Sequence, residues 1–216
     1  MKILNLYAGI GGNRKLWGDS HEIIAVEHDP KIAQIYKDFF PNDEVVVADA
    51  HEYLLAVMQN SNDIDFIWSS PPCPTHSRAR YAMANSDNQD FKDKYNQNPV
   101  FPSMVLYEEI LFLEHYFKGK YCVENVIAFY PPLIPPHQMG GHWFWTNFLL
   151  RDFDSGMNRE HNSPVVVLEK RKGFDLSKYK IKDKGRVLRN CVEPEVGLHI
   201  MNYARKQEDD LFKLKH

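Results

Sequence analysis

Residues 1–12 have the sequence MKILNLYAGIGG, in which an apolar run passes directly into a glycine-rich turn. Lys2 to Leu6 predicts a strand, and a short helix is expected after the turn. Glycines at such a turn let the backbone adopt positive φ and approach a ligand closely. The plainer alternative is a tight turn with no ligand. In either case the stretch predicts the first unit of an α/β fold.

The first half of the chain repeats this order of strand, turn and helix. Asp29 followed by Pro30 is typical of a helix N-cap with proline in the first turn. Further strands are expected at 22–26, 44–47, 65–68 and 121–123, and helices at 30–39, 51–59 and 103–117. This alternation predicts a mostly parallel sheet with helices on both faces. Ligand sites on such sheets lie at the carboxyl ends of the strands.

Length and composition limit the class of protein. A chain of 216 residues with 44% hydrophobic residues can form one sizeable core, or one domain with a small appendage. No apolar run is long enough to span a membrane, and we expect no signal peptide. The three cysteines favour a reducing, cytoplasmic compartment over a disulfide framework, and no Cys/His set predicts a metal site. The net charge of −3 does not indicate nucleic-acid binding.

Two carboxylates follow the next two predicted strands and favour a particular kind of cofactor. Glu27 ends the second strand, where it can accept both hydroxyls of a ribose, and Asp49 ends the third, where it can accept from an adenine amine. Arg14 stands where a dinucleotide-binding turn requires its last glycine. A nucleoside cofactor without a pyrophosphate fits these groups, and S-adenosylmethionine is the common one. Each carboxylate could instead be a helix cap or a solvated turn residue.

A cysteine and a glutamate follow the fourth and fifth predicted strands. Cys73 lies in the segment SSPPCPTHS at 69–77, whose prolines restrict the backbone and can aim a thiol into a cleft. The polar segment 78–98 that follows predicts a long, functional loop. Glu124 would lie beside Cys73 if the two strands are neighbours. The alternatives are a buried cysteine that acts as a small hydrophobe, and a glutamate in a cap or surface ion pair.

Three motifs together resemble the DNA cytosine-5 methyltransferases. They are YAGIGG at 7–12, Pro72-Cys73, and Glu124-Asn125-Val126, in the family's order and spacing. The resemblance covers residues 1 to about 130 and resumes faintly at 143–147 and 190–192. It implies a Rossmann-like S-adenosylmethionine-dependent methyltransferase fold, and an enzyme of DNA methylation and restriction-modification.

The resemblance also implies the catalytic roles. Cys73, after Pro72, would attack C6 of cytosine as a thiolate, so that C5 takes the methyl group. Glu124 would hold N3 and the exocyclic amine of the base. Asn125 would brace the loop that carries Cys73.

Cofactor and DNA contacts follow from the same resemblance. Tyr7 stands where the family has a phenylalanine that packs on the cofactor. The implied cofactor-binding residues are Tyr7, Ala8, Gly9, Ile10, Gly11, Gly12, Glu27, Asp49, Ala50 and Asn190. The substrate would be double-stranded DNA with the target cytosine flipped out. Ser77, Arg78 and Arg80 would open the segment that closes over the DNA.

The sequence departs from the family pattern at several places. Pro74 follows the cysteine where glutamine or asparagine is usual. The two arginines of the family's eighth motif are missing from its expected place at 138–142, where His142, or Arg78, Arg80 or Arg186, would have to substitute. Only about 40 residues separate Asn147 from Asn190, where the family has a large target-recognition region.

We therefore expect three parts in the chain. A catalytic domain at 1–150 is followed by a short basic region at 151–189 and a C-terminal helix at 190–216 that completes the catalytic domain. The segment 170–189 holds nine Lys and Arg residues, which could bind phosphates or form a solvated surface. We expect a monomer of prokaryotic or phage origin, with a partner subunit as one means of target recognition.

Three other functions are compatible with the sequence. The first is an RNA cytosine-5 methyltransferase, because its chemistry would be identical. The second is a binding module that keeps the sheet and the cofactor pocket without catalysis. The third is a thiol hydrolase that uses Cys73 and His76, although these residues share one rigid turn and no oxyanion hole is evident.

Overall fold

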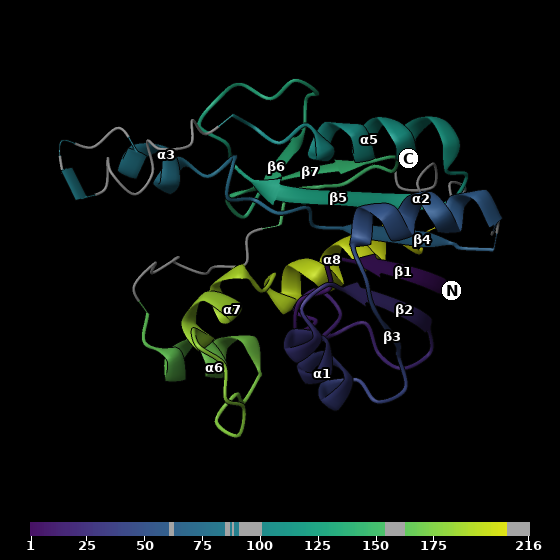
Figure 1. The fold of residues 1–216 in the computed structure, drawn as a ribbon. Helices are drawn as coiled ribbons and strands as arrows, with labels where there is room; N and C mark the ends of the chain where they lie inside the picture. Colours follow the sequence, from purple (N-terminus) through teal and green to yellow (C-terminus); the bar gives the residue numbers. More distant parts are fainter. Residues whose placement is uncertain (61–62, 85–86, 88, 91–100, 154–162, 207–216) are drawn as a thin grey trace.

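A single sheet forms the centre of the molecule (Figure 1). The computed structural model describes residues 1–60, 63–84, 87, 89–90, 101–153 and 163–206. The strands are β1 (Lys2–Leu6), β2 (Glu22–Glu27), β3 (Glu44–Val47), β4 (Phe66–Ser69), β5 (Lys120–Val126), β6 (His137–Met139) and β7 (His142–Thr146). Their order is β3-β2-β1-β4-β5-β7-β6. The first five are parallel, whereas β7 is antiparallel to both β5 and β6.

Helices cover both faces of the sheet. They are α1 (Pro30–Phe39), α2 (Ala50–Asn60), α3 (Arg78–Ala84), α5 (Val105–Tyr116), α6 (Val165–Lys172), α7 (Lys184–Asn190) and α8 (Pro194–Ala204). Alternate residues of a strand face opposite sides: Leu4 packs in the core that holds residues of α2 and α5, and Ile3 packs with residues of α8. Figure 1 shows α5 above the strands, α2 at the level of β4 and β5, and α1, α6 and α7 lower in the view. The predicted α/β class is confirmed.

Most predicted elements occur within two residues of their expected ends. The Asp29 side chain accepts a hydrogen bond from the Lys31 N–H at 2.8 Å, and Pro30 begins α1, as the sequence predicts. Strand β5 extends further than predicted and includes Glu124 and Asn125. Cys122 of this strand is a core residue with no exposed surface.

The short helix predicted after the glycine turn is wrong. Residues 12–16 form turns instead, with hydrogen bonds from Lys15 N–H to the Gly12 carbonyl and from Trp17 N–H to the Arg14 carbonyl. Arg14 is buried and pairs with the Asp43 carboxylate at 2.9 Å. Its side chain is thus fixed by a partner that lies before β3, outside any local helix.

The start of the segment 78–98 is a helix, whereas its polarity predicts a long loop. Its first residues form α3, and Tyr81 of this helix stacks on Phe129 with ring centroids 4.2 Å apart. This aromatic contact ties the start of the segment to the chain beyond β5. Residues 85–86, 88 and 91–98 of the predicted loop lie outside the described residues.

The basic region shares a hydrophobic core with α1. Leu168, Phe174, Leu176 and Leu188 are fully buried, or nearly so, and belong to one cluster with Ile35 and Tyr36 of α1. Lys172 is also buried, and it pairs with Glu193 at 2.8 Å. The region therefore contains packed structure beneath its charged surface.

The C-terminal part of the chain returns to the turn after β1. A Cβ added at Gly12 would lie 2.3 Å from the Cys191 sulfur, so no side chain fits there. The Trp17 indole donates to the Gly197 carbonyl of α8 at 3.1 Å. Residues 207–216 of the predicted C-terminal helix lie outside the described residues. None of the helices in the described part of the chain has the length and apolar character that a membrane crossing needs.

Candidate active site

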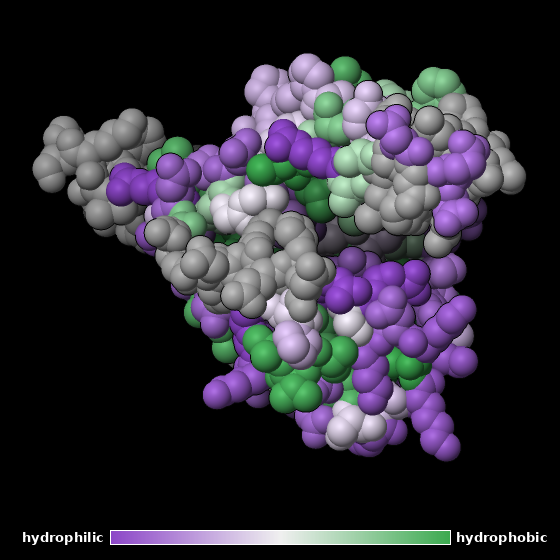
Figure 2. Space-filling model, turned by 90° about the vertical axis from the view of Figure 1, so that its left-hand side faces the viewer, coloured by the Kyte–Doolittle hydropathy of each residue, from purple (hydrophilic) through white to green (hydrophobic). Residues whose placement is uncertain are grey.

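The carboxyl ends of β4 and β5 bring the Cys73 segment and Glu124 to the same edge of the sheet. Ser69, the last residue of β4, pairs with Val123 of β5 in parallel register. The chain therefore leaves β4 beside Glu124 and reaches Cys73 four residues later. Figure 2 looks onto this side of the molecule, where the described surface is largely hydrophilic and a hydrophobic patch lies in the lower half.

Cys73 and Glu124 interact electrostatically. Burial raises the pKa of the Cys73 thiol, and the negative charge of Glu124 raises it further. Glu124 is only 8% exposed, whereas the cysteine is partly exposed. The thiol is therefore protonated at neutral pH in the free protein, and it would need a proton acceptor or a bound substrate before it could act as a nucleophile.

Hydrogen bonds from the β5 segment hold the chain around Cys73. The Asn125 amide donates to the Pro71 carbonyl at 3.0 Å, between two buried residues. The backbone N–H groups of His76 and Ser77 both donate to the Cys73 carbonyl, which closes a tight turn. Pro72, which precedes Cys73, is exposed. The position of Cys73 is thus set by β5 as well as by the prolines.

A hairpin that the sequence analysis missed places His142 at this site. Gly140 and Gly141 both have positive φ and form a two-residue turn between the paired residues Met139 and His142. Two glycines with positive φ are typical of the type I′ hairpin turn. The His142 imidazole lies 3.4 Å from the Glu124 carboxylate. In the sequence, the Gly140-Gly141 pair between two short segments with strand character is the feature that could have predicted this hairpin.

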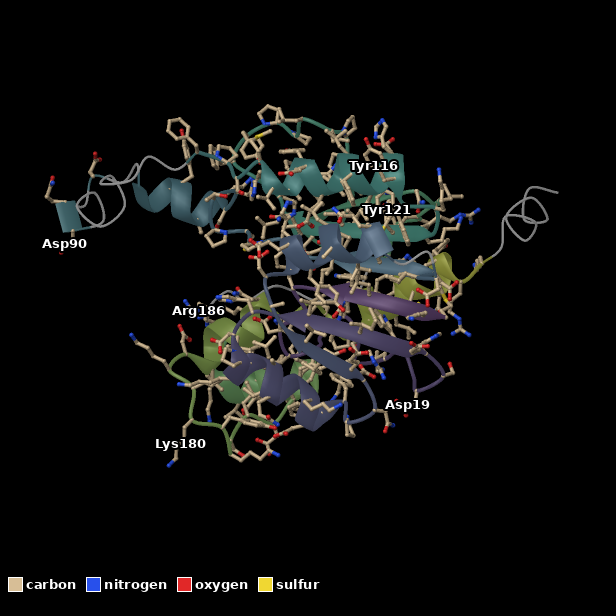
Figure 3. All side chains as sticks on the ribbon, turned by 45° about the vertical axis from the view of Figure 1, so that its right-hand side comes forward. Asp19, Asp90, Tyr116, Tyr121, Lys180 and Arg186 are labelled. Carbon is tan, nitrogen blue, oxygen red and sulfur yellow. The ribbon has the colours of Figure 1, made fainter. Side chains whose placement is uncertain are left out.

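The other predicted substrate-contacting cations are placed differently. The Arg78 guanidinium donates to the Ala128 carbonyl at 2.9 Å, and Ser77 forms a β-bridge with Ala128. Arg80 lies in α3, but its side chain is outside the described structure. Arg186 is exposed on α7, in the lower half of the molecule (Figure 3). Of the four candidates, only His142 is shown beside Glu124.

The turn after β1 and the two carboxylates suit a nucleoside cofactor. Glu27 accepts the N–H groups of Gly9 and Asp29, each at 2.9 Å, so both of its oxygens keep a lone pair for a ribose hydroxyl. A Cβ added at Gly9 would meet no atom within 4 Å, so there is open space against the turn. Asp49 is exposed and caps α2, where Ala50 is buried. These residues fit S-adenosylmethionine.

The remaining predicted cofactor residues lie around the same turn. Ala8 and Ile10 are buried, and Gly11 and Gly12 pack against α1 and Cys191 respectively. Asn190 ends α7 one residue before Cys191 and is exposed. The segment that holds Asn190 is therefore next to the glycine turn.

Glu109, for which the sequence motifs predict no role, is fully buried on α5. It accepts hydrogen bonds from the Tyr7 and Ser69 hydroxyls, each at 2.5 Å, and lies 3.1 Å from the His51 imidazole. Burial raises the pKa of this carboxyl, and the hydrogen bonds partly oppose the rise. Glu109 lies at helical spacing from Leu106 and Leu113 on the apolar face of α5, and this spacing is the sequence feature that could have predicted its burial.

Comparison with known proteins supports this interpretation. A model of the C-5 cytosine-specific DNA methylases matches residues 1–110 of the 216. Among solved structures, DNMT2 of Spodoptera frugiperda, a triple mutant, is 28% identical over 58% of this chain, with a TM-score of 0.39. An S-adenosylmethionine-dependent methyltransferase of Agrobacterium tumefaciens is 13% identical over 60% of this chain and 40% of its own, with a TM-score of 0.42.

The alignments are partial. The chain spans about a third of the DNMT2 structure, because the alignment covers 35% of that chain. A hypothetical protein of Thermus thermophilus is 17% identical, with 67% of this chain and 73% of its own covered and a TM-score of 0.44. No curated protein matches the sequence significantly.

The mostly parallel sheet and the turn after β1 define the class: the protein has the Rossmann-like fold of S-adenosylmethionine-dependent methyltransferases, and S-adenosylmethionine is its cofactor. Within that class, the chain belongs to the C-5 cytosine-specific DNA methylase family.

Proposed function

We propose that the protein methylates C5 of cytosine in double-stranded DNA through a covalent bond between Cys73 and C6. The observation that carries this proposal is the pairing of a partly exposed cysteine with a buried glutamate across the ends of β4 and β5, held by the bond from Asn125 to the Pro71 carbonyl. A thiol nucleophile beside a carboxylate that can hold N3 of the base suits addition to cytosine.

Each step assigns a task to this chain's residues. The Cys73 thiol gives up its proton as its sulfur adds to C6, and N3 gains a proton beside Glu124, which leaves C5 electron-rich. S-adenosylmethionine supplies the methyl group that C5 accepts. A base then removes the C5 proton, and the Cys73–C6 bond breaks to restore the C5–C6 double bond and the thiolate. Glu124 holds the exocyclic amine throughout, so that cytosine is chosen over bases that lack it.

Cytosine must leave the base stack to reach this site. C5 and C6 are covered inside a duplex, and flipping the base costs a few kcal/mol. The part of the chain that follows Cys73 begins with α3, which is anchored through Arg78 and the stack of Tyr81 on Phe129. We propose that this segment lies against the DNA and that His142 contacts the base in place of the missing arginines.

The test is methyl transfer to matched substrates. Purified protein with labelled S-adenosylmethionine is given duplex DNA, single-stranded DNA and tRNA, and the products are mapped by bisulfite sequencing. We expect 5-methylcytosine in duplex DNA. Transfer to tRNA and not to duplex DNA would replace the DNA proposal with the RNA alternative. Cofactor binding without transfer to any of the three would indicate a binding module.

A further inference from the structure

Glu109 is a fully buried carboxylate in an otherwise apolar interface. It lies on α5, whose neighbouring residues Leu106, Ile110 and Leu113 belong to the core between this helix and the sheet. Burial of a charged group is costly unless it is paired and hydrogen-bonded. The neighbouring elements must therefore supply hydrogen-bond donors to this carboxylate.

Three elements at the cofactor edge of the sheet supply those partners. Tyr7 directly follows β1, Ser69 ends β4, and His51 is the second residue of α2. The hydroxyls of Tyr7 and Ser69 donate to different oxygens of Glu109, and the His51 Nδ1 atom lies 3.1 Å from the oxygen that Tyr7 shares. One buried group thus fixes the ends of two strands and the start of a helix.

Tyr7 is held in an unusual backbone conformation at this point. Among the described residues, it is the only one other than glycine with positive φ, at 54°. A left-handed conformation is unfavourable for a residue with a Cβ, so it persists only where the surroundings hold it. The hydrogen bond from the Tyr7 hydroxyl to Glu109 is a direct means of holding it. Asp49 is also near, since its charge adds to the rise in the Tyr7 pKa.

We propose that Glu109 is a positioning residue for S-adenosylmethionine. Through Tyr7 it fixes the turn at 7–9, and through His51 it fixes the start of α2, beside Asp49 and Ala50. Through Ser69 it also fixes the strand that leads to Cys73. The cofactor site and the nucleophile are therefore aligned by one carboxylate that need not contact the cofactor itself. This inference rests on the proposed placement of the cofactor at that turn.

The test measures cofactor affinity separately from stability. We expect Glu109→Gln and Tyr7→Phe each to weaken binding of S-adenosylmethionine about tenfold or more in titration calorimetry, because a hydrogen bond to a charged group is lost. Thermal unfolding first defines a temperature at which every variant is folded. The rate at saturating cofactor and DNA should fall less than the affinity does. The double variant should bind no more weakly than Glu109→Gln alone, since both changes break the same link.

Tyr107→Phe is the matched control. Tyr107 is a buried tyrosine on the same helix, and its hydroxyl accepts the Leu133 N–H at 3.2 Å. We expect this variant to lose stability while its affinity for S-adenosylmethionine is unchanged. If Glu109→Gln does not fold, Tyr7→Phe and Ser69→Ala are each compared with Tyr107→Phe, and both should weaken binding of S-adenosylmethionine because each removes one hydrogen bond to Glu109.

Two results would overturn the inference. Glu109→Gln could lower the melting temperature while affinity stays at the wild-type value, which would make the carboxylate merely structural. Independent losses from Tyr7→Phe and Glu109→Gln would show that Tyr7 acts without Glu109. If the wild-type protein itself did not bind S-adenosylmethionine, the proposed cofactor site would be wrong. Failure of the cofactor site is therefore distinguishable from failure of the positioning role of Glu109.

Discussion

The imidazole Nε2 of His142 lies 3.4 Å from a carboxylate oxygen of Glu124. The two residues are diagonal neighbours on one face of the β5–β7 pair, because Glu124 lies opposite Phe144 and Val126 lies opposite His142. The contact thus follows from the antiparallel register of β5 and β7. It places a ring nitrogen beside the carboxylate that is proposed to hold the base.

Replacing His142 should therefore weaken catalysis. His142→Ala removes a hydrogen-bonding group beside a carboxylate, a loss of ~1.5–3 kcal/mol that corresponds to about a 10- to 150-fold fall in kcat/KM. His142→Arg should retain more activity than His142→Ala, because it restores the residue type that the family uses near the base. Steady-state kinetics on duplex DNA measure both. Equal activity of wild type and His142→Ala would remove His142 from the site.

The reactivity of Cys73 should depend on pH in a way that reports Glu124. Burial and the Glu124 charge both raise the pKa of the thiol, so alkylation by iodoacetamide should rise with pH and have its midpoint above that of an ordinary cysteine. Glu124→Gln removes the second cause and leaves the first. Its midpoint should therefore move to lower pH. Mass spectrometry of the Cys73 peptide gives the profile, and buried Cys122 is the internal control.

A midpoint in Glu124→Gln that is equal to or above that of the wild type would mean that the two side chains do not interact. His142 is the further titratable group beside Glu124, so the measurement is repeated in His142→Ala. A shift in that variant alone would assign the effect to the imidazole.

Glu27→Ala should weaken binding of S-adenosylmethionine. Loss of a charged partner for the ribose hydroxyls costs ~1.5–3 kcal/mol, or about 10- to 150-fold in affinity. The structure adds a second effect, since Glu27 also holds the N–H groups of Gly9 and Asp29. Asp49→Ala, on an exposed residue, should lower stability less. Calorimetry that gives the wild-type affinity for Glu27→Ala would limit this residue to holding the turn.

Arg186→Gln should reduce the salt dependence of DNA binding. Arg186 is exposed on α7, on the side of the molecule toward which the strands' carboxyl ends point (Figures 1 and 3). Loss of one phosphate contact lowers the slope of log K against log salt by about 1. Lys118→Gln is the control, because Lys118 is exposed just before β5, at the opposite end of that strand. Equal slopes for both variants would exclude α7 from the DNA interface.

The sequence predicts the sheet well because its signals are local. Apolar runs mark the strands, and Asp29-Pro30 marks the start of α1. The residues that follow Leu6, Val26, Val47, Trp68 and Val123 hold the predicted site because parallel strands end at one edge. Cys73 and Glu124 were expected to lie side by side only if the fourth and fifth predicted strands are neighbours. In the sheet, β4 and β5 are neighbours.

The features of the site that the sequence does not predict depend on contacts between residues that are distant in the chain. Glu109 follows Glu108 and could be taken for a second surface carboxylate, yet Tyr7, from the other end of the domain, donates to it. The nine cations at 170–189 look equivalent in the sequence, whereas Lys172 is buried against Glu193 and Lys178 lies 3.6 Å from Asp38. Only tertiary structure separates the cations that support the fold from those available to DNA.

The most direct test of the central claim is covalent trapping. Duplex DNA that contains 5-fluorocytosine is incubated with the protein and S-adenosylmethionine, since fluorine at C5 cannot leave as a proton does and the thiol cannot then be eliminated. We expect an adduct that survives denaturation and maps to the peptide with Cys73. Cys122→Ala should still form the adduct, and Cys73→Ala should not while still binding S-adenosylmethionine. Methylated DNA from Cys73→Ala, or an adduct at another residue, would contradict the account.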